Sequence, residues 1–262
     1  MTENLKITVA DGIAKITLDR PSRMNAFTFE MIDAWNSALE QCRKDAAVKV
    51  ILITGTGKAF CSGGDIVEMT ERLAHSPSQR KSELLERVQR IPLTLETLDK
   101  PVIAVLNGVA TGAGLDLALM CDIRYAARSA KFAETYLNVG LVQGAGGAYY
   151  LPRLVGISKA LEMFMTAEFV DADEALRIGL VNKVFPDEKL WEESERIAKK
   201  MAAAPQTALR TMKRAVYQSA RSDLRSSLDM ISSHYAIVTS LPDHREAVQK
   251  FAASRNAKKN EE

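Results

Sequence analysis

Apolar and polar residues alternate in two short runs at the start of the chain. Leu5–Ala10 and Ile13–Leu18 both show this alternation, and the pair Asp11-Gly12 separates them. An aspartate-glycine pair between two alternating runs is typical of a tight turn between antiparallel strands. We therefore expect the chain to begin with a β-hairpin.

Helical spacing and short buried runs follow the hairpin. Over residues 28–44 apolar side chains such as Met31, Trp35 and Leu39 recur at intervals of three or four, which predicts an amphipathic helix. Residues 48–54 and 102–106 are short aliphatic runs of the kind that form strands buried on both faces. Because helical patterns stand between and after these runs, the first two-thirds of the chain predicts an α/β fold of repeated strand–helix units.

The pattern changes near residue 187, beyond which only helical spacing is found. Prolines separate neighbouring helical stretches, which cover residues 189–204, 206–220, 224–239 and 244–254. We therefore expect two parts, an α/β body over residues 1–186 and a C-terminal helical segment over residues 187–262. The helical segment is expected to pack on the body or on a neighbouring subunit.

Composition narrows the function classes. The 262 residues are 47% hydrophobic, enough for a large core, and the net charge of +2 favours neither nucleic acid nor a membrane surface as a partner. No apolar run approaches the about 18 residues of a membrane span, and no signal-peptide pattern opens the chain. The three cysteines are widely spaced and are expected to be free thiols in a reducing compartment. These features predict a cytoplasmic protein.

Familiar ligand motifs are incomplete. The segment G-T-G-K at residues 55–58 lacks the first glycine and the hydroxyl residue of a phosphate loop. The three histidines, His75, His234 and His244, do not have the spacing of metal ligands, so we expect no metal site.

Two glycine-rich turns share one layout, in which a strand leads into the turn and a helix leaves it. They are A-F-C-S-G-G-D-I at residues 59–66 and N-G-V-A-T-G-A-G-L-D at residues 107–116. Glycines let a backbone approach a ligand closely, and the first amides of a helix have no partner inside it. Two such turns facing one point place two N–H donors on one oxygen, which is what stabilises an enolate or a tetrahedral oxyanion. Either turn alone fits an ordinary connection equally well, so the pair is the specific feature.

These turns resemble those of the crotonase, or enoyl-CoA hydratase/isomerase, superfamily. Further support comes from L-D-R-P-S-R-M-N-A at residues 18–26 and V-G-L-V-Q-G-A-G-G at residues 139–147, and the resemblance extends over about residues 5–255. It implies a crotonase-like spiral of ββα units with a C-terminal helical trimerisation segment. A homo-trimer or hexamer and a small-molecule acyl-CoA substrate are implied with it, and because coenzyme A is part of the substrate, no separate cofactor is expected.

The resemblance also assigns residues. It implies that the amides of Gly64 and Ala113 form the oxyanion hole and that Asp116 is an acid or base acting at C2 or C3 of the acyl chain. An acid favoured by the dipole at the start of a helix is the alternative for Asp116. Contacts with the substrate, mainly its coenzyme A part, are expected at Arg23, Ala26, Ala59, Cys61, Ser62, Asp65 and Ile66.

One position departs from the family pattern. The second glutamate of family hydratases aligns with Tyr136, and a tyrosine with its ordinary pKa near 10 is a poor base at pH 7. Glu134 lies two residues upstream, where we expect a solvent-facing acid, with a substitute catalytic acid as the alternative. A single obvious carboxylate makes double-bond isomerisation mechanistically easier, whereas hydratases dominate the family. Hydration of a 2-enoyl-CoA is therefore the first expectation, with an isomerase or a weakly catalytic acyl-CoA-binding protein as alternatives.

Overall fold

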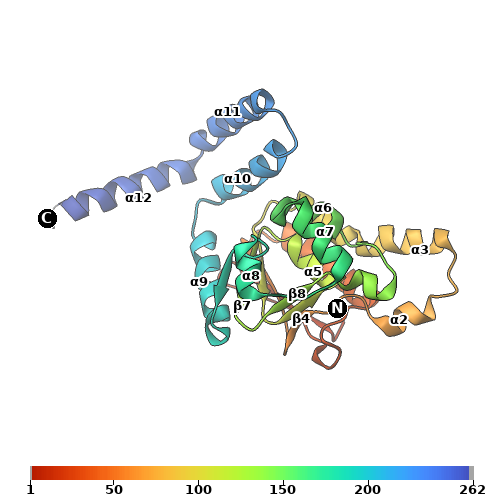
Figure 1. The fold of residues 1–262 in the computed structure, drawn as a ribbon. Helices are drawn as coiled ribbons and strands as arrows, with labels where there is room; N and C mark the ends of the chain where they lie inside the picture. The colour runs from red at the N-terminus through yellow and green to blue at the C-terminus, as the bar shows by residue number, and fades with distance from the viewer. Residues whose placement is uncertain (1, 260–262) are drawn as a thin grey trace.

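Two β-sheets and the helices around them form the body of the protein (Figure 1). The computed structural model describes residues 2–259. The larger sheet has six strands in the order β1 (Leu5–Ala10), β2 (Ile13–Leu18), β3 (Val50–Gly55), β5 (Val102–Leu106), β7 (Ile123–Ala127) and β10 (Lys183–Phe185). The smaller sheet has the order β4 (Ala59–Cys61), β6 (Val109–Thr111), β8 (Lys131–Ala133) and β9 (Val170–Asp171).

Consecutive strands alternate between the two sheets. β3, β5 and β7 are parallel neighbours in the larger sheet, and β4, β6 and β8, each of which follows one of them in the chain, are parallel neighbours in the smaller sheet. A helical segment follows each pair of strands. This repeat is the predicted spiral of ββα units, so the predicted fold class is confirmed.

The opening hairpin is also confirmed. β1 and β2 pair antiparallel from Leu5 opposite Leu18 to Ala10 opposite Ile13. Asp11 and Gly12 both have positive φ angles, 52° and 77°, as a two-residue hairpin turn of this hand requires. The strand predicted at residues 48–54 is β3, which is buried at every position.

Helical segments stand between and after the strands. The predicted helix at residues 28–44 is α1 (Phe29–Lys44), and the Thr28 side chain accepts a hydrogen bond from the Met31 amide at its start. The other helical segments of the body are η1 (Pro21–Arg23), α2 (Ile66–Glu71), α3 (Pro77–Glu83), η2 (Leu84–Val88), α4 (Arg90–Thr97), α5 (Ala113–Leu119), η3 (Thr135–Val139), α6 (Gly147–Val155), α7 (Ile157–Thr166) and α8 (Ala172–Arg177).

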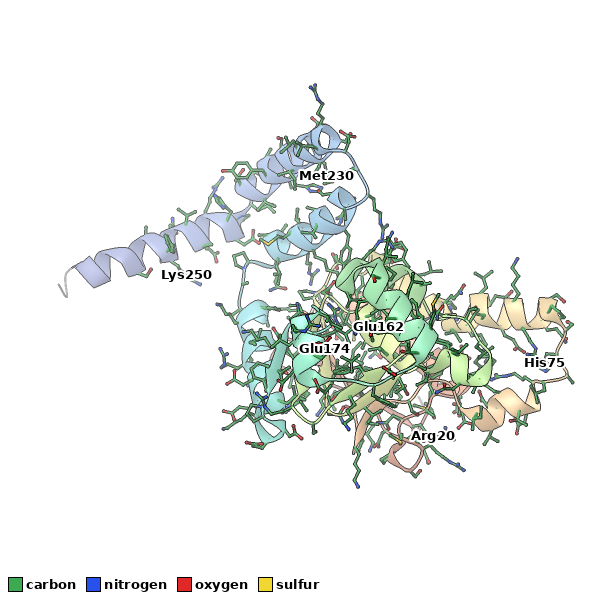
Figure 2. All side chains as sticks on the ribbon, viewed as in Figure 1. Arg20, His75, Glu162, Glu174, Met230 and Lys250 are labelled. Carbon is green, nitrogen blue, oxygen red and sulfur yellow. The ribbon has the colours of Figure 1, made fainter. Side chains whose placement is uncertain are left out.

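The predicted helical tail comprises η4 (Asp187–Lys189), α9 (Leu190–Ala202), α10 (Gln206–Ser219), α11 (Leu224–Ser240) and α12 (Pro242–Lys259). α9 packs on the body and buries Leu190 and Ala198, whereas α11 buries none of its residues. α10 contacts the body through Lys213 and Tyr217, which both bond to Asp122. α11 and α12 lead away from the body, and the labelled side chains Met230 and Lys250 lie far from the sheets (Figures 1 and 2). No helix within residues 2–259 combines the length and apolar character that a membrane crossing needs.

Candidate active site

The two glycine-rich turns lie against each other. A Cβ atom added to Gly63 in the first turn would lie 3.6 Å from the backbone nitrogen of Ala113 in the second. A Cβ atom added to Gly114 would lie 2.2 Å from the carbonyl oxygen of Cys61, which is closer than any real contact of this kind. Glycine at residue 114 is therefore what allows the start of α5 to approach the first turn.

The amide of Gly64 points away from the neighbouring segment. The Phe27 amide donates to the Gly63 carbonyl at 2.8 Å, and the Asp65 amide donates to the Phe27 carbonyl at 2.9 Å. Because backbone groups of successive residues in extended chain point to opposite edges, the N–H of Gly64 is directed away from Phe27. Gly64 lines two adjoining cavities, so its amide is available to a ligand there.

The amide of Ala113 is available for a different reason. Ala113 is the first residue of α5, and the first turn of this helix closes when the Asp116 amide donates to the Gly112 carbonyl at 2.9 Å. An amide before that first bond has no partner inside the helix. Within residues 2–259 no protein group accepts a hydrogen bond from the amide of Ala113 or of Gly64, and Ala113 lines the same two cavities as Gly64. The structure thus brings both predicted oxyanion residues together.

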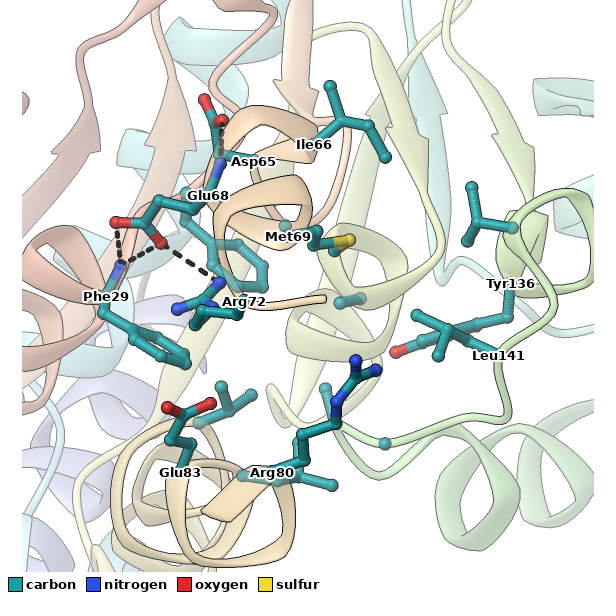
Figure 3. Close-up of a pocket in the computed structure, with 18 of the residues that line it drawn as sticks. Phe29, Asp65, Ile66, Glu68, Met69, Arg72, Arg80, Glu83, Tyr136 and Leu141 are labelled. Atoms are coloured by element: carbon teal, nitrogen blue, oxygen red, sulfur yellow. Dashed lines mark hydrogen bonds and ion pairs between the residues drawn. The ribbon is translucent and has the colours of Figure 1, made fainter. Parts of the chain in front are cut away.

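The two cavities differ in chemical character. The larger has a volume of about 540 Å³ and is lined mostly by apolar side chains, among them Ile66, Met69 and Leu141 (Figure 3). The smaller has a volume of about 340 Å³ and includes the polar side chains of Ser62 and Asn138. Both cavities are lined by the same two residues with free amides. One elongated ligand can therefore occupy both cavities and place a polar atom beside the two amides.

Five of the seven predicted substrate contacts line the smaller cavity: Arg23, Ala26, Ser62, Asp65 and Ile66. Ala59 and Cys61 line neither cavity, and the expected contact of this segment with the substrate stays a prediction. Both belong to β4, where they are 1% and 0% exposed. Burial raises the pKa of the Cys61 thiol to about 12, and the thiol donates to the Asn25 carbonyl at 3.1 Å. These two residues therefore hold the turn in place from the core.

Asp65 fixes the first turn rather than offering a free acid. Its carboxylate accepts hydrogen bonds from the amides of Val67 and Glu68 at the start of α2 and pairs with Arg20. Burial favours a higher pKa for Asp65, but Arg20 and the two amides outweigh it and hold the pKa below its usual range. Asp65 thus caps the start of α2, and its pair with Arg20 ties the turn to the segment after β2.

Tyr136 stands between the cavities and Asp116. Its hydroxyl group donates to Oδ2 of Asp116 at 2.5 Å. Tyr136 lines both cavities, whereas Asp116 is 0% exposed and lines neither. Figure 3 shows the Tyr136 ring reaching into the larger cavity from the side opposite Phe29 and Arg72. Asp116 therefore does not reach either cavity directly, and its expected action on the acyl chain stays a prediction.

The surroundings of Asp116 act on its pKa in opposite directions. Burial raises the pKa to about 6, while the Tyr136 hydroxyl and the nearby amides of Gly147 and Ala145 favour the anion. Gly147 begins α6, and a Cβ atom there would lie 1.9 Å from Oδ1 of Asp116. The carboxylate thus meets the start of a helix, where a negative charge is stabilised. Above pH 6 it is expected to be an anion ready to accept a proton.

Glu134 is buried, so the expectation of a solvent-facing acid is wrong. Its side chain is 0% exposed, and it is the residue directly before η3. Burial first, and then the charge of Asp116, raises the pKa of Glu134 to about 10. Glu134 is therefore neutral at pH 7. Its position two residues before Tyr136 made it an alternative catalytic acid, but nothing in the sequence predicted its burial beside Asp116.

Charged residues along the larger cavity were not predicted from the sequence. The Glu68 carboxylate accepts from the Phe29 amide at 3.0 Å and pairs with Arg72 at 3.4 Å, and the guanidinium group of Arg72 stacks on the Phe29 ring (Figure 3). Arg80 and Glu83 of α3 also line this cavity. No group of three or more side chains suited to holding a metal ion is found in the described part of the chain.

Comparison with known proteins shows which family the chain belongs to. The family model described as enoyl-CoA hydratase/isomerase matches residues 8–261. A crotonyl-CoA hydratase from Syntrophomonas wolfei is 34% identical over 97% of both chains, and a 1,2-epoxyphenylacetyl-CoA isomerase from Escherichia coli is 34% identical over 98% of both. The crystal structure of an enoyl-CoA hydratase from Mycobacterium smegmatis has a TM-score of 0.90 at 33% identity and 97% coverage of both chains. The chain belongs to the enoyl-CoA hydratase/isomerase family, within the crotonase superfamily.

Proposed function

We propose that the protein catalyses the reversible addition of water to a 2-enoyl-CoA. The observation that carries this proposal is the pair of unpartnered amides, Gly64 and Ala113, at the junction of an apolar and a more polar cavity. Two amides aimed at a thioester oxygen stabilise the enolate that forms when water attacks C3. Relatives described as hydratases of crotonyl-CoA and of short-chain enoyl-CoA support the same reaction.

The two cavities suggest how the substrate lies. The acyl chain fits the larger cavity, since Phe27, Leu84 and Val88 offer apolar contact there. The pantetheine part of coenzyme A fits the smaller cavity, where Arg23 offers a positive charge at the edge for a phosphate group. The thioester carbonyl then lies between the cavities, beside both amides.

Tyr136 is the group that exchanges protons with this substrate. As the water oxygen bonds to C3, a water proton passes to the Tyr136 oxygen and the phenol proton passes to Asp116. The resulting enolate then takes a proton at C2 from Tyr136, which recovers one from Asp116. Burial and the charge of Asp116 raise the pKa of Tyr136, so the phenol remains neutral before and after each turnover. One phenol backed by one carboxylate thus serves both the water and C2.

Double-bond isomerisation is the second candidate, and one observation favours it. Tyr136 with Asp116 behind it is the single proton-exchanging pair found at the junction of the cavities within the described residues. Moving a proton between C2 and C4 of an enoyl-CoA needs one such pair and no water. Relatives described as isomerases, including one acting on trans-2-decenoyl-[acyl-carrier-protein], are 30% to 34% identical to this chain.

Assays with enoyl-CoA esters test the proposal. We expect the protein to hydrate crotonyl-CoA, seen as loss of the absorbance of the conjugated thioester, and to convert 3-enoyl-CoA more slowly. Rapid conversion of 3-enoyl-CoA without hydration would identify an isomerase. Binding of CoA esters in a competition assay with neither reaction, across chain lengths, would show an acyl-CoA-binding protein and overturn the catalytic proposal.

We propose in addition that the helical tail joins copies of this chain into a trimer or hexamer. An exposed apolar stripe on α11 supports this, since its members recur at helical spacing: Leu224, Leu228, Ile231 and Tyr235. Replacing Leu228 and Ile231 with serine is expected to lower the mass measured by light scattering to that of a smaller assembly. Asp229→Ser, on another face of α11, is the control, and a wild-type monomer would contradict the proposal.

A further inference from the structure

We propose that Glu134 is a positioning residue that carries a proton and donates it in a hydrogen bond to Asp116, so that Asp116 is held as an anion between two donors. Tyr136 is the donor on one oxygen of Asp116, and Glu134 is the donor on the other. This inference rests on the proposed function only where it concerns catalysis. The protonation of Glu134 is a property of the folded protein itself.

The unpartnered oxygen atoms of the two carboxyl groups carry the inference. Oδ2 of Asp116 accepts from Tyr136. Oδ1 of Asp116 and both oxygens of Glu134 are buried and accept no hydrogen bond of ordinary geometry among residues 2–259, although the amides of Gly147 and Ala145 act on Asp116 from nearby. Both side chains are 0% exposed. Buried polar atoms without partners are costly, and two buried anions in contact are costlier still. One proton on Glu134, shared with Oδ1 of Asp116, removes the second charge and gives a partner to Oδ1 and to one of the two Glu134 oxygens.

The charged groups around Glu134 favour the same arrangement. Burial and Asp116 raise the pKa of Glu134, and a hydrogen bond from Glu134 lowers that of Asp116. Tyr136 from η3 is the other titratable group that acts on the pair, and α6 contributes the amide of Gly147 beside Asp116. Among the described residues, the groups with the largest effect on either pKa include no lysine or arginine. The pair therefore carries one negative charge, and that charge lies on Asp116.

The consequence for the site is a fixed carboxylate. With donors on both oxygens, Asp116 cannot rotate away from Tyr136, and the Tyr136 hydroxyl is kept aimed at the cavity junction. Glu134 does not line either cavity, so it acts on the reaction through Asp116 alone.

Proton release on unfolding tests the protonation of Glu134 without any substrate. Between pH 7 and pH 8.5 folded Glu134 holds a proton that the unfolded chain has lost, so unfolding releases that proton and stability falls as pH rises. We expect the unfolding equilibrium constant of the wild type to rise about tenfold more per pH unit than that of Glu134→Gln. Glu168→Gln, at an exposed glutamate, is expected to keep the wild-type slope. Equal slopes for wild type and Glu134→Gln would overturn the inference even if the enzyme is active.

The pH profile of kcat/KM separates positioning from general stability. Glu134→Gln keeps a neutral donor for Asp116, whereas Glu134→Leu removes it. We expect Glu134→Leu to move the acidic limb of the profile upward by about one pH unit and to lower kcat more than it raises KM. Glu134→Gln is expected to keep the limb close to that of the wild type. An equal displacement in both variants, or in neither, contradicts a hydrogen bond from Glu134 to Asp116.

Discussion

Replacing Ala113 with proline is expected to lower kcat/KM for an enoyl-CoA by about 10²- to 10³-fold, the usual effect of removing one donor from an oxyanion hole. Proline has no backbone N–H, so the substitution deletes the donor that we place on the thioester oxygen. The loss should fall mainly on kcat, because the charge on that oxygen grows in the transition state. Steady-state kinetics with crotonyl-CoA measures the effect.

The local backbone makes this substitution unusually specific. Ala113 is the first residue of α5, where proline fits the helix and breaks no hydrogen bond. The residue before a proline avoids the α conformation, and Gly112, with φ 49° and ψ −128°, is not in it. The fold is therefore expected to survive, which thermal unfolding of the variant can verify.

Ile157→Pro is the matched control. Ile157 is the first residue of α7, also follows a glycine, and is 71% exposed far along the chain from both turns. It is expected to show a similar change in stability with unchanged kinetics. Wild-type kcat/KM in a folded Ala113→Pro variant would show that this amide does not bind the substrate's oxygen.

The order of the elements could be read from the sequence because each depends on local chemistry. The positive φ angles at Asp11 and Gly12 suit the residues found there, and the aliphatic run of β3 is buried as such runs usually are. That consecutive strands alternate between two sheets is not encoded locally. It depends on pairings between residues far apart in the chain, such as Ala59 with Val109, and it was available beforehand only through the family resemblance.

As with the fold, one part of the site could be predicted from the sequence and another part could not. The free amides of Gly64 and Ala113 follow from turns whose glycines are visible in the sequence. The arrangement of the acids was not visible, because Glu134 and Asp116 are brought together by packing of η3 and α6 against α5. A carboxyl group is expected to face water unless a partner is buried with it. The partner of Glu134 is Asp116, and the two come together only in the folded chain.

Tyr136→Phe is expected to lower kcat by about 10²- to 10⁴-fold, because it removes the hydroxyl group that exchanges protons with water and C2. KM should change little, since the ring that lines both cavities remains.

Asp116→Asn should lower kcat by a similar factor, because the phenol remains but the amide that replaces its acceptor does not take up a proton. In the wild type, kcat/KM should fall as pH drops below about 6, because Asp116 must be an anion to accept the phenol proton and its pKa is raised to about 6.

Tyr217→Phe is the control for Tyr136→Phe. It removes a tyrosine–aspartate hydrogen bond without removing the hydroxyl group that we propose exchanges protons with the substrate. The Tyr217 hydroxyl donates to Asp122 at 2.9 Å between α10 and the body, and it lines neither of the two cavities. Both phenylalanine variants lose one hydrogen bond to a carboxylate, with a stability cost of about 1–3 kcal/mol each. Only Tyr136→Phe should lose activity. If hydration persists at the wild-type rate in Tyr136→Phe but is abolished in Asp116→Asn, the carboxylate must reach the substrate itself, which requires the ring to move from where the structure places it.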